Sequence, residues 1–176
     1  MSLKYEILKR IVKMVNIRGR WEGMTTEELL ETKRKQNAKN VIPELKDAEF
    51  VISRTEVLGF PVLKMIHKKK TEKANLFLIG GGMITAPRPG SIRKALRFAK
   101  ETGVDVFVPY YPLCTDYPLT KAYEMIHATY REMLKEYRAE DISVLGTSSG
   151  GNLALGMVPY INDGYGYAPV SPCPVL

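Results

Sequence analysis

The nine residues Gly146-Thr147-Ser148-Ser149-Gly150-Gly151-Asn152-Leu153-Ala154 follow the short apolar run Ile142-Ser143-Val144-Leu145. The apolar run predicts a buried strand, and the residues from about Gly150 onward predict a helix. A serine flanked by glycines at this kind of strand-to-helix turn is the G-x-S-x-G pattern of a nucleophile elbow. The turn needs small residues two positions before and after the serine, because a Cβ there would collide with the strand or the helix. The pattern therefore predicts Ser148 as a nucleophile raised above the end of a sheet.

Other interpretations of this stretch remain open from the pattern alone. A G-x-S-x-G sequence can be an ordinary glycine-rich turn or a loop that holds a phosphate. A Walker-type phosphate loop would need lysine directly before a serine or threonine, and no lysine follows Gly150 or Gly151. Ser149 is the rival nucleophile, but it lacks the symmetric glycine spacing. We expect Ser149 to act through its backbone N–H, which the start of a helix aims at a developing oxyanion.

A second glycine-rich segment follows an earlier apolar run. Residues 75–79 read Asn-Leu-Phe-Leu-Ile and predict a strand buried on both faces, and Gly80-Gly81-Gly82 come directly after it. Glycines at this point allow the backbone to approach a ligand carbonyl closely and to turn N–H groups toward it. Alone, the triplet also fits a flexible lid or a nucleotide loop. Together with the elbow, it predicts the other half of an oxyanion hole, with Gly81 and Gly82 as donors.

The order of the other elements indicates an α/β protein. Helical spacing predicts helices at residues 4–15, 25–38, 91–101 and 119–137, and the second begins with a capping box of Thr25 and Glu28. A strand pair is expected between Glu49 and Ile66, and an apolar run at 104–108 predicts a further buried strand. Alternation of strands and helices implies a mostly parallel sheet covered by helices on both faces.

These landmarks together resemble the hormone-sensitive-lipase-like branch of the α/β-hydrolases. That family carries H-G-G-G on one loop and G-[DT]-S-[AS]-G-G-N-L-A at the elbow, and residues 146–154 match the second motif without a gap. The family's intervening D-Y-R-L-A-P-E-x-P segment is similar to residues 110–118. The resemblance implies an α/β-hydrolase fold and a serine esterase acting on short-chain acyl esters. It also implies an oxyanion hole from the N–H groups of Gly81, Gly82 and Ser149, and cap helices over the acyl pocket.

The chain departs from the family pattern at several points. Ile79 stands where the family has a histidine that braces the oxyanion loop, so we expect a less rigid loop. The family's catalytic acid and histidine follow later strands, in the chain order Ser, Asp, His. The only histidines here, His67 and His127, precede the nucleophile, and neither is placed to act as its base. The C-terminal strands are therefore expected to be absent, through truncation, a frameshift or an incomplete sequence.

Two functional classes follow from this pattern. The first is a carboxylic ester hydrolase whose base and acid lie outside these residues. The second is a non-catalytic or degenerate member of the fold that binds a small hydrophobic ligand. We expect residues 1–176 alone to be inactive, because no base accepts the proton of Ser148. We also expect them to aggregate or form oligomers, because the sheet would have an uncovered edge and an uncovered apolar face.

Composition adds little that is specific. The net charge is +7, but the basic runs at 33–35 and 68–70 are not interleaved with aromatics as nucleic-acid binding would require, so no nucleic-acid partner is expected. The basic amphipathic helix at 4–15 is expected to pack on the protein rather than on a membrane. With two distant cysteines, no secretory leader and no apolar run long enough to cross a bilayer, we expect a cytoplasmic protein. We expect cap helices at 1–45, a partial hydrolase core at 46–176, and no cofactor or metal.

Overall fold

The computed structural model describes residues 23–160, so the helix expected at 4–15 and the segment after Tyr160 lie outside the described residues. The described elements, in chain order, are α2 (Thr26–Ala38), β1 (Phe50–Val57), β2 (Phe60–His67), β3 (Ala74–Leu78), α3 (Pro89–Thr102), β4 (Asp105–Pro109), α4 (Leu119–Met133), a 3-10 turn (Ala139–Asp141), β5 (Ile142–Gly146) and α5 (Ser149–Tyr160). Each element expected within this range is present. The helix at 119 is shorter than expected, because it ends at Met133 and the chain turns before Tyr137.

The five strands form one mixed sheet in the order β1-β2-β4-β3-β5. The hairpin β1–β2 is antiparallel and β2 pairs antiparallel with β4, whereas β3 lies parallel to both β4 and β5. The register places Leu78, the last residue of β3, beside Gly146, the last residue of β5. The glycine-rich segments that follow these two strands therefore leave the sheet at the same edge, as the sequence predicts.

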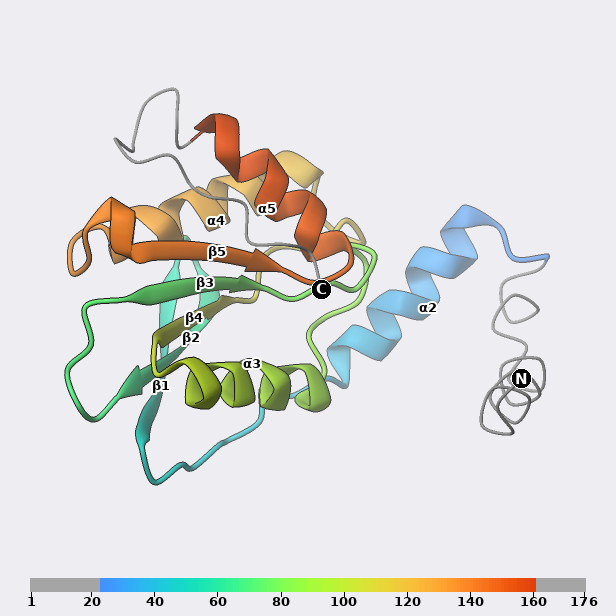
Figure 1. Cartoon of the computed structure of the whole chain (residues 1–176). Helices are drawn as coiled ribbons and strands as arrows, with labels where there is room; N and C mark the ends of the chain where they lie inside the picture. Colours follow the sequence, from blue (N-terminus) through green and yellow to red (C-terminus); the bar gives the residue numbers. More distant parts are fainter. Residues whose placement is uncertain (1–22, 161–176) are drawn as a thin grey trace, which may run out of the picture.

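Helices cover both faces of this sheet, which confirms the expected α/β-hydrolase architecture (Figure 1). Helix α3 lies on one face, where its Ile92, Ala95 and Ala99 join an apolar cluster with Phe77 and Val108. Helices α4 and α5 lie on the other face and build a second cluster. Its members include Leu76, Phe107, Met125, Ile126, Tyr130, Met133, Leu153 and Met157. The residues of α4 that recur at helical spacing, Ala122, Met125, Ile126, Thr129 and Met133, are all buried, which explains its 3.6-residue periodicity.

Local signals in the sequence set several helix ends. Thr25 caps α2 by accepting the N–H of Glu28 at 3.2 Å, and the Glu28 carboxylate accepts the N–H of Thr25 at 2.7 Å. This reciprocal pair is the predicted capping box. Pro89 occupies the first turn of α3, and Gly103 ends that helix in the left-handed region at φ 69°. These local signals set the start of α2 and both ends of α3.

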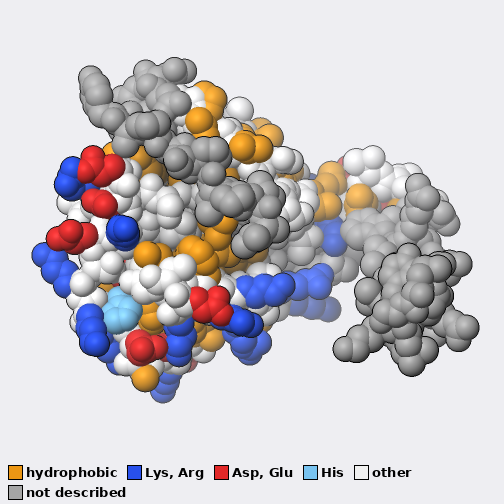
Figure 2. Space-filling model, in the orientation of Figure 1, with side chains coloured by type: hydrophobic (Ala, Val, Ile, Leu, Met, Phe, Trp, Pro, Cys, Tyr) orange, Lys and Arg blue, Asp and Glu red, His pale blue; other side chains and the backbone are white. Residues whose placement is uncertain are grey.

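The charged side chains are mixed on the face shown in Figure 2. Lysines and arginines gather over α3 and the lower part of this face, with aspartates and glutamates among them. Several form ion pairs, such as Lys100 with Asp47 at 2.9 Å and Arg97 with Glu101 at 2.7 Å. Exposed pairs of this kind contribute little stability, and their main effect is to offset part of the positive charge locally.

Candidate active site

The predicted elbow forms a sharp turn between β5 and α5. Ser148 has φ 52°, in the left-handed region that few residues other than glycine adopt. The N–H of Gly150 donates to the Thr147 carbonyl at 2.9 Å, and the N–H of Gly151 donates to the Ser148 carbonyl at 2.8 Å. The Ser148 side chain is exposed at the start of the helix. A strained backbone that presents one serine to solvent is what a nucleophile elbow requires.

The glycines of the motif are needed because backbone segments lie against them. A Cβ on Gly146 would stand 2.1 Å from the Gly150 carbonyl oxygen. A Cβ on Gly150 would stand 2.0 Å from the carbonyl oxygen of Leu78 in β3. Both distances are far below van der Waals contact, and backbone atoms cannot move aside as a flexible side chain can. The geometry therefore agrees with the spacing argument made from the sequence.

The glycine-rich loop after β3 lies directly against the elbow. A Cβ on Gly80 would be 2.1 Å from the Thr147 carbonyl oxygen and 2.8 Å from the Ser148 Cβ. The Gly80 N–H donates to Thr147 Oγ1 at 3.1 Å, and the Thr147 N–H donates to the Leu78 carbonyl at 3.0 Å. The fold thus brings together two motifs that are 68 residues apart along the chain.

The three predicted oxyanion donors are in different situations. The Gly81 N–H donates to Ser149 Oγ at 3.0 Å. Gly82 is exposed and has φ 61°, and no acceptor for its N–H or for that of Ser149 lies within residues 23–160. Two of the three donors therefore have no hydrogen-bond acceptor among residues 23–160. The sequence analysis missed the use of the Ser149 hydroxyl, since nothing in the local pattern signals a bond to Gly81.

The same bond bears on which serine is the nucleophile. Ser149 is half-buried and its hydroxyl oxygen accepts a backbone N–H, whereas the exposed Ser148 hydroxyl has no hydrogen-bond partner in the described part of the chain. An oxygen that accepts an N–H is a weaker nucleophile than one whose lone pairs are open. This difference favours Ser148.

Tyr111 is a further residue of the site, and the sequence analysis quoted it only within a motif. Its side chain is 5% exposed, and its hydroxyl donates to the Ile79 carbonyl at 2.6 Å. Burial raises the pKa of the Tyr111 phenol to about 12, and a hydrogen bond from the Ser149 side chain opposes part of this rise. The phenol is therefore protonated and a donor at neutral pH.

Ile79 stands between Tyr111 and the glycine-rich loop. Its side chain is 3% exposed and packs in the apolar cluster on the α3 side of the sheet. The residue thus contributes its backbone to the site and its side chain to the core. The bonds made by Gly80, Gly81 and the Ile79 carbonyl brace the loop without a histidine at this position. The lower rigidity expected from Ile79 remains a prediction.

The two histidines lie on different elements, and neither is part of the elbow or of the Gly80–Gly82 loop. His67 ends β2 and its N–H donates to Asp105 Oδ1 at 2.6 Å, at the start of β4. Since Ser148 follows the opposite end of the parallel strands, the length of the sheet separates the two residues. His127 lies within α4, where its ring packs against Tyr123 with centroids 5.8 Å apart. The position of His67 agrees with the expectation that it is not the base, and the same expectation for His127 remains a prediction.

Helix α2 is attached to the loops around the site through polar side chains. Asn37 donates to the Ile84 carbonyl and accepts the Ala86 N–H, each at 2.9 Å. Arg34 pairs with Asp116 at 2.9 Å and also donates to the Thr115 carbonyl. These contacts place α2 beside both the segment after Gly82 and the segment after Tyr111. The domain boundary at residue 45 remains a prediction.

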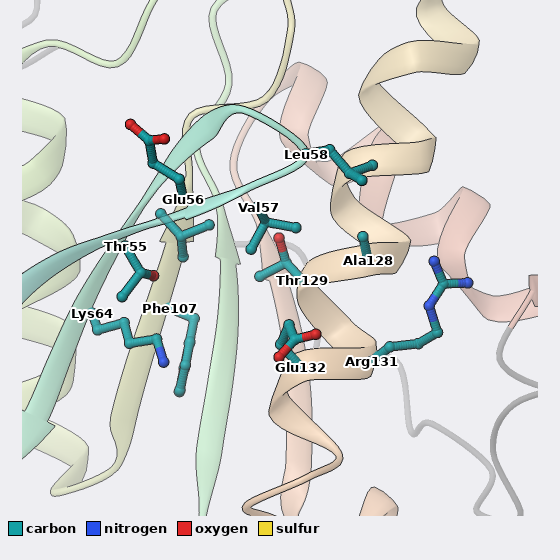
Figure 3. A pocket seen from close by; sticks show the side chains of 11 residues that line it. Thr55, Glu56, Val57, Leu58, Lys64, Phe107, Ala128, Thr129, Arg131 and Glu132 are labelled. Atoms are coloured by element: carbon teal, nitrogen blue, oxygen red, sulfur yellow. The ribbon is translucent and has the colours of Figure 1, made fainter.

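Three pockets among the described residues are lined by residues other than those of the elbow and the Gly80–Gly82 loop. One of about 470 Å³ is formed between the β1–β2 hairpin and α4, where Lys64 and Phe107 face Thr129 and Glu132 (Figure 3). A second, of about 320 Å³, separates α2 from residues 85–89, and a third, of about 600 Å³, lies along residues 41–46. None of them is lined by residues 80–82 or 146–151.

Residues 23–160 contain neither a membrane-spanning helix nor a cluster of metal ligands. No helix there is long and apolar enough to span a bilayer. No group of three or more His, Cys, Asp or Glu side chains in that range is arranged to hold a metal ion.

Comparison with solved structures shows the same fold. A protein from Staphylococcus aureus assigned as an esterase superposes with a TM-score of 0.75 at 20% identity, over 90% of this chain and 56% of its own. An esterase from the bacterial hormone-sensitive lipase family superposes with a TM-score of 0.67 at 23% identity, over 96% of this chain and 56% of its own. An esterase/lipase from an uncultured bacterium superposes with a TM-score of 0.61 at 20% identity, over 83% of this chain and 56% of its own. This chain therefore spans little more than half the length of each.

Sequence comparison identifies the family. No curated protein matches the chain. The model of a family with the alpha/beta hydrolase fold matches residues 76–172, which is more than half of the chain and includes both glycine-rich motifs. The chain belongs to this alpha/beta hydrolase family.

Proposed function

We propose that this chain carries the nucleophile and oxyanion site of a serine carboxylic ester hydrolase that acts on short-chain acyl esters. The observation that carries the proposal is the contact between the Gly80–Gly82 loop and the strained turn at Ser148. In the proposed reaction, Ser148 Oγ attacks the ester carbonyl carbon, the alcohol leaves, and water hydrolyses the acyl-serine. The esterases among the similar structures are consistent with this chemistry.

The proposed oxyanion hole consists of backbone N–H groups. The N–H groups of Gly82 and Ser149 have no hydrogen-bond acceptor among residues 23–160, so we assign them as the principal donors, with Gly81 as a third that is shared with the Ser149 hydroxyl. Donors fixed in position before the reaction stabilise a developing negative charge without reorganisation, and each is typically worth about 10²–10³ in kcat. No metal or cofactor enters this proposal.

The proposal requires a general base that these 176 residues do not supply. The sequence contains two histidines; His67 lies at the edge of the sheet opposite Ser148, and His127 lies on α4, before the nucleophile in the chain. A serine hydroxyl is a weak nucleophile at neutral pH unless a base accepts its proton. The base and its orienting acid are therefore assigned to residues outside this sequence, and the activity is a property of the full-length protein.

The test is covalent labelling of the full-length protein with a fluorophosphonate probe, which reacts only with activated serines. We expect labelling at Ser148, its loss in Ser148→Ala, and its retention in Ser149→Ala. Hydrolysis of p-nitrophenyl acetate and butyrate should exceed that of the decanoate. An unlabelled wild-type protein would contradict the proposal.

A second candidate is a non-catalytic member of the fold that binds a small hydrophobic ligand. It is favoured by the absence of a hydrogen-bond partner for the Ser148 hydroxyl among residues 23–160 and by the apolar Ile79. This candidate predicts a folded full-length protein that neither labels nor hydrolyses any of the esters, and that binds p-nitrophenyl butyrate without turnover.

A further inference from the structure

Two hydroxyl groups hold the oxyanion loop from opposite sides of Gly80. The Tyr111 hydroxyl donates to the Ile79 carbonyl at 2.6 Å, and Ser149 Oγ accepts the Gly81 N–H at 3.0 Å. The two side chains come from the segment after β4 and from the first turn of α5. Two separate parts of the chain thus contact residues 79–81.

The positions of these bonds matter because Gly80 has no room to move toward the elbow. Gly80 has no Cβ, and a Cβ added to it would stand 2.1 Å from the Thr147 carbonyl oxygen and 3.0 Å from the Ser149 nitrogen. Steric contact therefore limits the approach of the loop to the elbow. The hydrogen bonds made by Tyr111 and Ser149 limit its movement in the other direction, away from the elbow.

The position of this loop affects the N–H groups proposed as oxyanion donors. The Gly82 N–H belongs to the next peptide unit, which is joined to the held peptide through the Gly81 Cα, so a shift of the held peptide displaces the Gly82 N–H. Stabilisation of an oxyanion depends steeply on the donor distance, and a displacement of about 1 Å can cost as much as 10²-fold in rate. Tyr111 is nearly fully buried and its hydroxyl is a donor at neutral pH, so the bond persists under assay conditions.

We propose that Tyr111 and the Ser149 hydroxyl are positioning residues that set the Gly80–Gly82 loop against the elbow and thereby fix the oxyanion donors. This inference rests on the proposed ester hydrolysis. Neither side chain contacts the reacting atoms in this assignment. Ser149 has two separate roles, because its backbone N–H is an oxyanion donor and its hydroxyl holds Gly81.

The experiment compares Tyr111→Phe, Ser149→Ala and the double variant in the full-length protein. Each single variant should lower kcat for p-nitrophenyl acetate about tenfold, with KM changed by no more than about twofold, because an oxyanion forms only after the ground state. The double variant should lose little more than the larger single loss, since both hydroxyls act on one loop. Tyr130→Phe is the matched control. It removes the hydroxyl of another buried tyrosine, which lies on α4 and not at the loop, so it should leave kcat unchanged.

A second measurement does not depend on catalysis. In the ¹⁵N-labelled protein, the Gly81 amide should exchange its hydrogen faster in both single variants, and most in Ser149→Ala, while Tyr130→Phe leaves it unchanged. If the Gly81 exchange rate and kcat both stay at wild-type values, the inference is wrong even though Ser148 still labels. If the wild type does not hydrolyse esters, the proposed function fails, and an unchanged exchange rate in Ser149→Ala would overturn the loop assignment separately.

Discussion

The hydroxyl of Tyr137 donates a 2.6 Å hydrogen bond to Oδ2 of Asp105, a carboxylate that is 3% exposed at the start of β4. The other oxygen, Oδ1, accepts the His67 N–H at 2.6 Å. The bond ties the turn after α4 to the edge of the sheet opposite the elbow. Burial, followed by the hydrogen bond to Asp105, raises the pKa of Tyr137, so the phenol stays protonated.

Removing this hydroxyl should destabilise the protein. Tyr137→Phe keeps the ring, which packs edge-on against Phe107, but leaves a buried carboxylate oxygen without its donor. Hydrogen bonds to charged groups contribute about 1.5–3 kcal/mol, and we expect the free energy of unfolding to fall by that amount. Urea denaturation of the variant measures the loss, and a change below about 0.5 kcal/mol would be inconsistent with this role for the bond.

Tyr130, which lies within α4, offers the opposite case. Its side chain is fully buried in the cluster under α4, and its hydroxyl has no hydrogen-bond partner among the described residues. Because an unpaired buried hydroxyl costs free energy, Tyr130→Phe should leave the stability unchanged or raise it by up to about 1 kcal/mol. The same denaturation series checks this, and a marked destabilisation would indicate a partner for the phenol that is not in the described chain.

The sequence predicted the elements of the site well because their signals are local. The apolar runs around Leu76 and Val144 are short and each is followed by glycine, and the spacing of Gly146 and Gly150 around Ser148 has a steric cause that the structure confirms. Register then follows, since parallel strands end at the same edge and bring Gly80 to the elbow.

What the sequence missed depends on contacts between distant segments. Ser149 resembles a second candidate nucleophile until its hydroxyl is seen beside Gly81, 68 residues earlier. Tyr111 has no local pattern that predicts its bond to the Ile79 carbonyl. The helix at 119 was predicted to reach Tyr137, but that side chain turns to the buried Asp105 and the helix ends at Met133. In each case a tertiary hydrogen bond decides the outcome, and periodicity carries no information about it.

The stability of the fold should decrease at acid pH partly because of His127. Burial, followed by the positive charge of Arg131, lowers the pKa of this imidazole below its ordinary value. As the pH falls through the ordinary pKa of a histidine side chain, about 6.5, His127 takes up a proton more readily in the unfolded chain than in the folded protein. The free energy of unfolding therefore falls with pH in this range. His127→Gln should show a shallower fall between about pH 7.5 and 5.5, and equal slopes for variant and wild type would contradict the assignment.

The glycines of the elbow provide the sharpest test of its geometry. Gly146→Ala and Gly150→Ala each place a methyl group about 2 Å from a backbone carbonyl oxygen, so the strand and the helix must separate. We expect each to lower the free energy of unfolding by about 3 kcal/mol or more, and to abolish fluorophosphonate labelling of the full-length protein. Gly151→Ala is the matched control in the same turn, because its new Cβ finds its nearest neighbour, the Gly146 carbonyl oxygen, at an ordinary 3.6 Å. Alanine is also the better helix former, so this variant should stay within about 1 kcal/mol of the wild type and keep its labelling. Equal losses in all three variants would mean that the helix, and not the tight turn at Ser148, accounts for the requirement for glycine.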